Sequence, residues 1–502
     1  MAEECVSDLF GIFDFTTGDL LALQTNNPAA PRINIQGLIS STANSVVLLG
    51  DSRMSANTYN SPVIARYDYA GWFVALNQYL GAPFDIRANF GTGGVDSSVV
   101  RYVQLPQALA LNPRPALAVL DVGYNNFVTD GKAEQVIADV TAIAASLYAA
   151  GIRVIIANSI PGDTVGVSGS KYANQCAYNR WLLNTGAQLP GVVGVLDLHS
   201  LVMDPTTGVL RASYKDAVGY HLNASGSGVA GIGAAPTVNR LAKPTTAPFL
   251  GAFDATAQLM GNPRLVGSTA TGIGAGTTGT LPNNHTSGRS GTAAGAFSQV
   301  ARPDTLTGTR TRIAHTGGAR GDTVTLGAAN FNLVSYAAST FYNYPDRIRP
   351  TVPNGRQYLV TNTGGYTDAG TDPTASWPTT LGATFTVNGN LNIKVVDSID
   401  VGDKIQLVTE VWADSFSGGA AIYNSVFTLN ASYSPLFTAN GGFVDNQSTA
   451  YPASVAPYQI IRSAPMVILP TTKIISVTTV CATEAGVTGN WYVGRCELQK
   501  YA

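Results

Sequence analysis

The chain has 502 residues, more than one hydrophobic core usually supports, so two or three domains are expected. Charged residues make up only 12% of it, about half the usual share, and the 53 glycines indicate a turn-dense, β-rich chain. The formal net charge of −2 gives no electrostatic basis for binding nucleic acid or an anionic membrane, and neither partner is expected.

The first ten residues, MAEECVSDLF, are acidic and lack the basic and apolar regions of a signal peptide, so we expect none. No apolar run approaches the roughly 18 residues that a membrane-spanning helix requires. The four cysteines and four histidines lack metal-ligand spacing, and we expect no structural zinc and no cofactor. Cys481 and Cys496 flank an expected turn and could pair in an exported protein, but reduced, buried thiols are the favoured interpretation.

Residues 1–44 contain short, mixed, proline-containing segments and are expected to form an N-terminal arm. Residues 45–245 alternate between the patterns of buried strands and helices, which predicts an α/β fold with a parallel sheet. Ligands of such folds gather at the carboxyl ends of the strands. The expected strands are SVVLLG, FDIRAN, ALAVLDV, RVIIANSI and VVGVLDL, and the expected helices include AEQVIADVTAIAASLYAAG and KYANQCAYNRWLLNTGAQL.

Residues 246–502 are predicted to be nearly all β. They begin with a stretch rich in Gly, Thr, Ala and Pro, in which spaced Leu, Val and Ile favour short strands; His285 and His315 are expected to be exposed there. TFTVNGNLNIKVV predicts a hairpin around Asn388-Gly389, and DKIQLVTEVWA and TTKIISVTTVCAT alternate as strands. We expect one large β-sandwich, or two small ones.

The stretch SVVLLGDSRMS places Gly50-Asp51-Ser52 at the end of an expected strand, as an ordinary turn or as the site of a nucleophile. A nucleophilic serine needs a histidine base, a carboxylate to orient it and donors for an oxyanion. Three later stretches contain such residues in loops that follow strands. They are RANFGTGGVDSS with Asn89, Gly91, Gly94 and Ser97, LDVGYNNF with Gly123 and Asn125, and YKDAVGYHLNASGSG with Asp216 and His221.

In this order, the stretches resemble the blocks of the SGNH (GDSL-type) hydrolase family, over about residues 45 to 240. The resemblance implies a flavodoxin-like, three-layer α/β/α domain and a two-step acyl transfer, with Ser52 as nucleophile and His221 as base. It also implies an oxyanion hole formed by the backbone N–H groups of Ser52 and Gly94 and the side chain of Asn125. The family's Gly-x-Asn-Asp block ends here in Asn126, which is expected to change local support rather than chemistry.

The family's final Asp-x-x-His block is broken in this chain. The residue three before His221 is Val218, and the nearest carboxylate is Asp216, five before. We favour Asp216 reaching His221 from a longer loop. A Ser-His dyad, or orientation of the histidine by Asp197 or Asp204, stays open.

Two other residues lie near these blocks in the sequence. His199, which follows the strand VVGVLDL, competes with His221 as the base. Arg53, directly after Ser52, is interpreted as a solvated or ion-paired side chain and is assigned no role.

Gly261 to Asn284 resembles the opening of jelly-roll, carbohydrate-binding-type modules that follow hydrolase domains in some bacteriophage tail proteins. The resemblance implies a tail spike or fibre, made in the host cytoplasm and carried on the virion, that removes O-acetyl groups from a bacterial surface polysaccharide. A homotrimer would suit such a fibre. Trp377, Trp412 and Trp491 are candidates for stacking on sugars, although core positions are more typical of β-sandwiches.

Other functions stay open. The protein could be a bacterial carbohydrate, aryl or lipid esterase, cytoplasmic or exported by a non-classical route. It could also be a virion protein that binds glycan or serves as structure without catalysis, which the broken Asp-x-x-His block favours.

Overall fold

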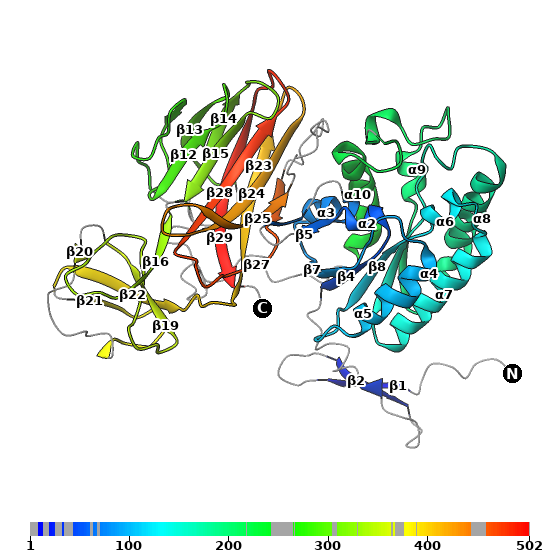
Figure 1. Ribbon diagram of the computed structural model, residues 1–502, viewed down its shortest axis with the longest axis horizontal. Helices are drawn as coiled ribbons and strands as arrows, with labels where there is room; N and C mark the ends of the chain where they lie inside the picture. Colours follow the sequence, from blue (N-terminus) through cyan, green and yellow to red (C-terminus); the bar gives the residue numbers. More distant parts are fainter. Residues whose placement is uncertain are drawn as a thin grey trace.

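The computed structural model shows three successive parts along the chain: a small N-terminal sheet, an α/β part and a β-rich part (Figure 1). The N-terminal sheet has three antiparallel strands, β1 (Leu9–Phe13), β2 (Leu20–Thr25) and β3 (Ile33–Asn34), so the expected arm contains regular structure. The residues that the structure describes are 9–13, 20–25, 33–34, 44–60, 64–67, 71–216, 218–241, 265, 267–303, 309–328, 330–362, 365–366, 376–387, 389–442 and 458–500.

The α/β part is built on a five-stranded parallel sheet in the order β10-β9-β8-β4-β7. Numbered by their order along the chain, these strands run 2-1-3-4-5 across the sheet, which is the flavodoxin-like order. The predicted α/β fold class is confirmed, because the five predicted apolar runs are these strands. They are β4 (Ser45–Gly50), β7 (Asp85–Asn89), β8 (Leu117–Asp121), β9 (Arg153–Ala157) and β10 (Val192–Leu196).

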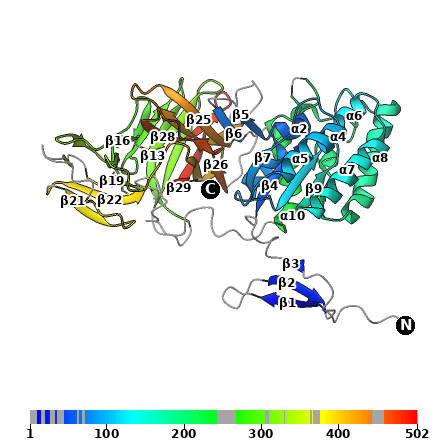
Figure 2. The same ribbon diagram turned by 60° about the horizontal axis from the view of Figure 1, so that its bottom comes forward.

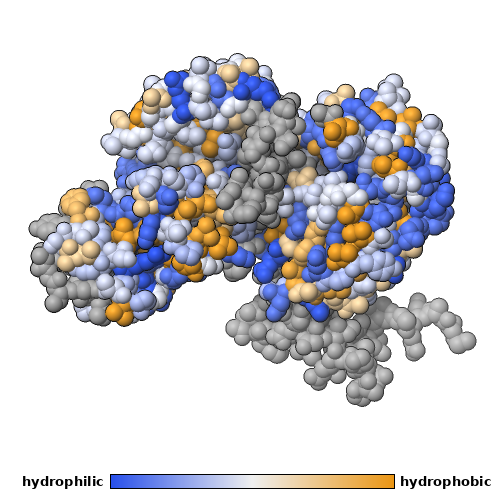
Figure 3. Space-filling model, viewed as in Figure 1, coloured by the Kyte–Doolittle hydropathy of each residue, from blue (hydrophilic) through white to orange (hydrophobic). Residues whose placement is uncertain are grey.

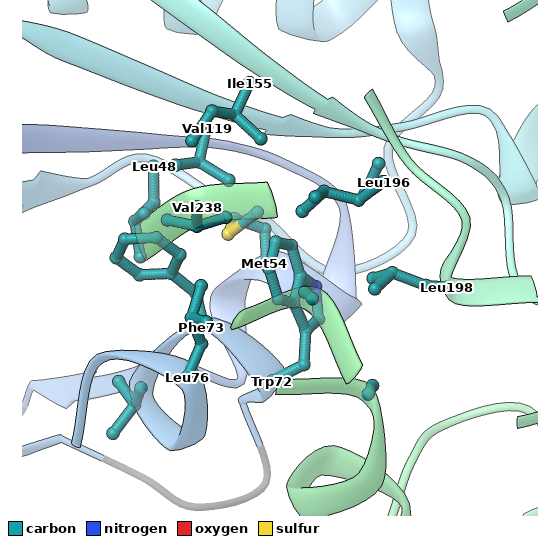
Figure 4. Packing of buried hydrophobic residues seen from close by; sticks show 14 of the residues in the cluster. Leu48, Met54, Trp72, Phe73, Leu76, Val119, Ile155, Leu196, Leu198 and Val238 are labelled. Carbon is teal, nitrogen blue, oxygen red and sulfur yellow. The ribbon is translucent and has the colours of Figure 1, made fainter. Parts of the chain in front are cut away.

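Helices cover both faces of this sheet and complete the three layers. Because side chains alternate along a strand, Val46 and Leu48 pack into one core, and Val47 and Leu49 pack into the other. Figure 4 shows the first core, in which the Phe73 ring lies beside Leu48 and the Trp72 ring lies beside Met54. Its helices are α3 (Trp72–Tyr79), α9 (Leu198–Val202) and α10 (Ala224–Asn239), and those of the second core are α5 (Leu105–Leu109), α7 (Ala133–Ala149) and α8 (Gly169–Thr185).

Short helical segments complete the connections of the α/β part. One residue separates α2 from the end of β4, and two residues separate α6 from the end of β8, which places the first residues of both segments at the carboxyl edge of the sheet. The segments are α2 (Ser52–Ser55), α4 (Ser97–Val99), the π-helix η1 (Val100–Gln104), α6 (Tyr124–Val128), and the 3-10 turns η2 (Gly186–Gln188) and η3 (Ala212–Tyr214).

The outer surface of the α/β part is polar over α8. In the view of Figure 3, hydrophilic residues cover much of that edge, because α8 buries only a narrow set of side chains that includes Tyr178 and Leu182. Within the described ranges, no helix is long and apolar enough to cross a membrane.

The β-rich part contains two sheets that face each other as a sandwich. Leu407 and Leu498 of one sheet share a core with Val426 and Val477 of the other, and a second core surrounds Trp491. The predicted sandwich is therefore observed. Its strands are β11 (Thr277–Gly279), β12 (His285–Arg289), β13 (Ala294–Ala301), β14 (Thr309–Thr316), β15 (Thr323–Ala328), β23 (Lys404–Asp414), β24 (Ala420–Leu429), β25 (Pro435–Gly442), β26 (Tyr458–Arg462), β27 (Met466–Val467), β28 (Ile474–Thr483) and β29 (Gly489–Lys500).

A smaller lobe with its own core extends from one of these sheets through β16. Trp377 lies in this core beside Tyr358. The hairpin predicted at Asn388-Gly389 is present, with Val387 opposite Leu391, although Asn388 itself lies outside the described residues. The lobe's strands are β16 (Phe331–Ser335), β17 (Phe341–Tyr342), β18 (Arg347–Arg349), β19 (Arg356–Val360), β20 (Gly365–Tyr366), β21 (Thr384–Val387) and β22 (Leu391–Asp397).

Two histidines of the β-rich part contradict the sequence-based expectation. His285 and His315 are 5% and 2% exposed, not solvated. His315 lies on β14 beside Thr483, and burial lowers the pKa of each imidazole to about 4. Cys481 and Cys496 are free thiols in the cores, and burial raises the pKa of both.

A hairpin joins the α/β part to the β-rich part. Its strands β5 (Thr58–Asn60) and β6 (Ile64–Tyr67) directly follow α2 in the chain, yet they belong to the sheet that contains β24 and β28. β6 pairs in parallel with β25, with Ala65 next to Ala439. Figure 2 shows β5 and β6 between the two parts.

Apolar contacts extend this junction on either side of the hairpin. Ala464 and Phe437 of the β-rich part pack against the core beneath α3. Ala224, the first residue of α10, packs against Ala421 and Ala482 of β24 and β28. The β-rich part therefore contacts the α/β part at several helices.

The contact between α3 and α10 depends on a glycine. A Cβ at Gly231 would lie 2.6 Å from the backbone N of Leu76 and 2.7 Å from the backbone O of Trp72. We expect Gly231→Ala to lower the free energy of unfolding by about 1 to 3 kcal/mol, because α3 must move away. Urea unfolding of the full chain measures it.

Gly228, on the same helix, is the matched control, because a Cβ there meets nothing within 4 Å. Gly228→Ala is expected to stabilise by up to about 1 kcal/mol, through helix propensity alone. Equal effects of the two substitutions would contradict the proposed close contact.

Candidate active site

The candidate site lies at the carboxyl ends of β4 and β8. Ser52 opens α2, separated from the end of β4 by Asp51, and Asn125 lies in α6 after β8. β4 and β8 are neighbours at the point where the strand order reverses, which is where ligands bind in open α/β sheets.

The turn before Ser52 requires glycine at position 50. A Cβ at Gly50 would lie 2.0 Å from the carbonyl oxygen of Asp121 on β8. The side chain of Gln104, from η1, donates to Gly50 O (2.8 Å) and accepts from Gly50 N (2.9 Å). Asp51 then caps α2, since its Oδ1 accepts from the backbone N of Arg53 (3.0 Å). These contacts fix the backbone that carries Ser52.

The structure brings Ser52, His221 and Asp216 together in one hydrogen-bonded chain. Ser52 Oγ lies 2.8 Å from His221 Nε2, and His221 Nδ1 lies 3.0 Å from Asp216 Oδ2. A carboxylate only accepts, so Nδ1–H donates to Asp216 and Nε2 is left to accept the Ser52 hydroxyl. This is the arrangement in which a serine can be activated as a nucleophile.

A small hairpin explains the five-residue spacing of Asp216 and His221. Lys215 and Leu222 form an antiparallel bridge, and Asp216 N donates to His221 O (3.0 Å). The two residues are therefore opposite one another on the hairpin, and the turn between them holds the additional residues. Asp216 Oδ1 accepts from Gly219 N (2.9 Å), which fixes the carboxylate.

The competing residues lie elsewhere. Asp197 accepts from Asn158 Nδ2 (2.7 Å) and Ser200 Oγ (2.6 Å), and Asp204 accepts from the backbone N–H groups of its own turn. His199 Nδ1 lies 2.9 Å from the carbonyl oxygen of Ser159, and burial lowers the pKa of its imidazole. Of the carboxylates and histidines considered, the structure pairs Asp216 and His221 with Ser52.

The loop after β7 holds the predicted oxyanion glycine. Gly94 has φ +76, a backbone conformation that favours glycine, and a Cβ there would meet nothing within 4 Å. A Cβ at the preceding Gly93 would lie 3.9 Å from Ser52 Cβ, so this residue also approaches Ser52. The sequence blocks did not indicate Gly93 as a site residue. Asn125 Nδ2 donates one hydrogen to Val95 O (2.9 Å), and the amide has a second hydrogen to offer an oxyanion.

Asn126 stands where the family that the sequence resembles has Asp, and its hydrogen-bond partners explain the amide. Ser97 Oγ donates its only hydrogen to Asp139 Oδ2 (2.7 Å), so it has only lone pairs for Asn126. Asn126 Nδ2 donates to that oxygen (3.1 Å), and Asn126 Oδ1 accepts from Ser97 N (3.0 Å). An amide fits this site and a carboxylate does not, and Asn126 thereby joins α6 to Ser97 at the start of α4.

Two buried carboxyl groups lie beneath the nucleophile turn. Asp51 and Asp121 are each 1% exposed, and Asp121 Oδ2 accepts from Trp72 Nε1 (2.9 Å). Burial raises the pKa of both; together with the charge of Asp51 it raises the pKa of Asp121 to about 7. Among the residues that the structure describes, no group of three or more His, Cys, Asp or Glu side chains could hold a metal ion.

Comparison with known proteins gives similarities to solved structures only; no protein-family model and no curated protein matches the chain. A protein of the G-D-S-L family from Desulfitobacterium hafniense is 18% identical, over 39% of this chain and 99% of that one, with a TM-score of 0.32. A member of the lipolytic G-D-S-L family from Veillonella parvula is 16% identical, over 39% and 98%, with a TM-score of 0.31. A carbohydrate esterase family 3 structure from Talaromyces cellulolyticus is 16% identical, over 40% and 99%, with a TM-score of 0.31.

The raised pKa of Asp121 predicts a pH-dependent stability. Between about pH 4 and pH 7 the folded chain holds a proton that an unfolded aspartic acid has lost, so this group's contribution falls as the pH rises through that window. Asp121→Asn removes the titration and keeps an acceptor for Trp72. We expect the stability of the wild type relative to Asp121→Asn to fall by on the order of 2 kcal/mol from pH 5 to pH 8.

Urea unfolding of both proteins at the two pH values measures this difference. The lowered pKa values of His285 and His315 make folding more favourable as the pH rises, which is opposite to the effect of Asp121. Both proteins contain these histidines, so the difference in stability between wild type and Asp121→Asn excludes their contribution. Parallel pH profiles of the two proteins would show that Asp121 titrates normally.

Proposed function

We propose that this protein is a serine hydrolase that cleaves carboxylic esters. The observation that carries the proposal is the hydrogen-bonded chain from Ser52 Oγ through His221 to Asp216, at 2.8 and 3.0 Å. Its position at the switch point of a parallel sheet, beside the loop of Gly94, supports the same conclusion.

The proposed reaction has two steps. His221 Nε2 takes the Ser52 proton as Oγ attacks the ester carbonyl carbon, and the same proton then goes to the leaving alcohol. Water attacks the acyl-serine in the second step, with His221 again as base, and releases the acid. The Ser52 and Gly94 N–H groups and the Asn125 side chain would stabilise the oxyanion, each donor contributing about 3 kcal/mol.

We further propose an O-acetylated bacterial surface polysaccharide as the substrate and a phage tail protein as the setting. The low charge content and the large β-rich part joined to the α/β part support this proposal. Of the three candidate tryptophans, Trp377 and Trp491 are buried. Trp412 is partly exposed on the sandwich, with the guanidinium groups of Arg302 and Arg310 each 5.4 Å from its ring centroid, and is the remaining candidate for a sugar contact.

The main argument for a protein without activity was the broken Asp-x-x-His block. Because Asp216 lies opposite His221 on a hairpin and reaches Nδ1, that spacing no longer argues against catalysis. A glycan-binding virion protein without catalysis is therefore the second candidate.

Hydrolysis of p-nitrophenyl acetate by purified variants tests the proposed function. We expect Ser52→Ala and His221→Ala to lower kcat by on the order of 10⁴-fold or more, since each removes a group that acts in the transition state. Asp216→Asn should lower it by roughly 10²- to 10⁴-fold, because it removes the acceptor that fixes the histidine tautomer.

His199→Ala and Asp197→Asn are the matched controls, since they alter a histidine and an aspartate of the same part that do not contact Ser52. Both should retain kcat within about threefold. Wild-type hydrolysis no faster than that of Ser52→Ala, on this ester and on an acetylated glycan, would overturn the proposal and favour the non-catalytic protein.

The acyl group is tested by comparing p-nitrophenyl esters of acetate and octanoate, and by acetate release from an O-acetylated polysaccharide. A deacetylase is expected to have a kcat/KM for acetate at least about tenfold above that for octanoate, since a site shaped for acetyl gains nothing from a longer chain. Acetate release must depend on Ser52. A preference for octanoate, without acetate release from the polysaccharide, would instead indicate a lipid esterase.

A further inference from the structure

Arg53 differs from the solvated side chain that the sequence suggested. It follows Ser52 directly but is only 4% exposed. Its Nη2 donates to the carbonyl oxygens of Tyr220 (3.1 Å) and Pro161 (3.4 Å), and its Nε also points to Tyr220 O (3.4 Å). Burying a guanidinium is costly unless its donors find acceptors, so these contacts define where the side chain lies.

The guanidinium also contacts the aromatic residues beside the site. Its carbon lies 3.7 Å from the ring centroid of Tyr124, a cation–π contact. Tyr124 stacks on Tyr220, with centroids 6.3 Å apart, and the Tyr220 ring lies 4.5 Å from that of His221. Arg53 thus touches the residues that precede Asn125 and His221, and itself follows Ser52.

Among its described residues, the hairpin that carries His221 has a second charged tether, at Lys215. Lys215 Nζ pairs with Asp163 Oδ2 at 2.7 Å, with side chains 28% and 44% exposed, and exposed pairs of this kind contribute little. Val218, at the hairpin's turn, is 57% exposed. The buried contact from Arg53 to Tyr220 O is therefore the stronger charged link from this hairpin to the nucleophile turn.

We infer that Arg53 is a positioning residue that ties the hairpin of residues 215–222 to the nucleophile turn and so holds His221 within reach of Ser52. Its catalytic consequence rests on the proposed function. A lysine cannot replace it fully, because an ammonium lacks the planar fork that contacts Tyr220 O through both Nε and Nη2 and lies over the Tyr124 ring. Asp51 and Asp121 supply nearby negative charge, and the charge of Arg53 opposes the rise in their pKa caused by burial.

Kinetics of Arg53→Gln, Arg53→Lys and Lys215→Met on p-nitrophenyl acetate test the inference, each measured below the variant's unfolding temperature. We expect Arg53→Gln to lower kcat on the order of 100-fold, as for a small displacement of a catalytic group, with KM changed by less than about threefold. Arg53→Lys should recover part of this loss. Lys215→Met is the matched control, because it removes the exposed ion pair of the same hairpin, and it should keep kcat within about threefold.

A double-mutant cycle separates positioning of His221 from general stabilisation. In a His221→Ala background, adding Arg53→Gln should change the residual rate by less than about threefold, because the group it positions is gone. A further loss on the order of 100-fold in that background would overturn the inference. So would folded Arg53→Gln and Arg53→Lys proteins that both hydrolyse the ester at the wild-type rate.

Hydrogen exchange of the hairpin amides tests the tether without activity. The backbone N–H groups of Asp216 and Gly219 are hydrogen-bonded within the hairpin, and Arg53→Gln should speed their exchange by about tenfold or more, whereas Lys215→Met should not. Unchanged exchange would show that Arg53 does not hold the hairpin. If the wild type lacks Ser52-dependent hydrolysis, the proposed function fails, while this measurement still decides the tether.

Discussion

The close approach of β4 to β8 at Gly50 is the constraint on which the rest of the site depends. Only glycine fits at 2.0 Å from the carbonyl oxygen of Asp121, and this contact brings the ends of two adjacent parallel strands together. Ser52 then follows one strand and Asn125 the other, so the proposed nucleophile and the proposed amide donor lie at neighbouring strand ends without a long connecting loop. The buried carboxyls of Asp51 and Asp121 accompany this packing, and Arg53 supplies positive charge beside them.

Both departures from the blocks of the SGNH family, which the sequence resembles, have a local compensation. Asn126 stands where the family has Asp, and its neighbour Ser97 donates its hydroxyl to Asp139, so an amide completes the hydrogen bonds that a carboxylate would break. Asp216 stands two residues too far from His221, and a hairpin turn absorbs the difference. In each case the hydrogen-bonding requirement is retained while the residue or the spacing changes.

The sequence patterns that predict the parallel sheet, the helices α7 and α8 and the site residues are local. They are apolar runs, helical periodicity and turn residues at strand ends. Helix α3 gave no such signal, since seven of its eight residues are buried and the pattern has no polar face. Gln104 contacts Gly50, and Arg53 contacts Tyr220, across long distances in the sequence, and such contacts leave no local pattern from which they could be predicted. His285 and His315 were misassigned because burial depends on strand pairing, which glycine-rich composition does not specify.

The hairpin of β5 and β6 limits how the two parts of the protein can be exchanged during evolution. It leaves the α/β part immediately after α2 and pairs with β25, and Asn89 Nδ2 bridges Met54 O (2.9 Å) and Thr58 Oγ1 (3.1 Å) at its base. A recombination event near residue 245 that exchanged the β-rich part for an unrelated module would leave β6 paired with β5 alone, without β25 on its other side. The two parts are therefore expected to descend together as one evolutionary unit, unlike enzymes whose accessory modules are shuffled freely.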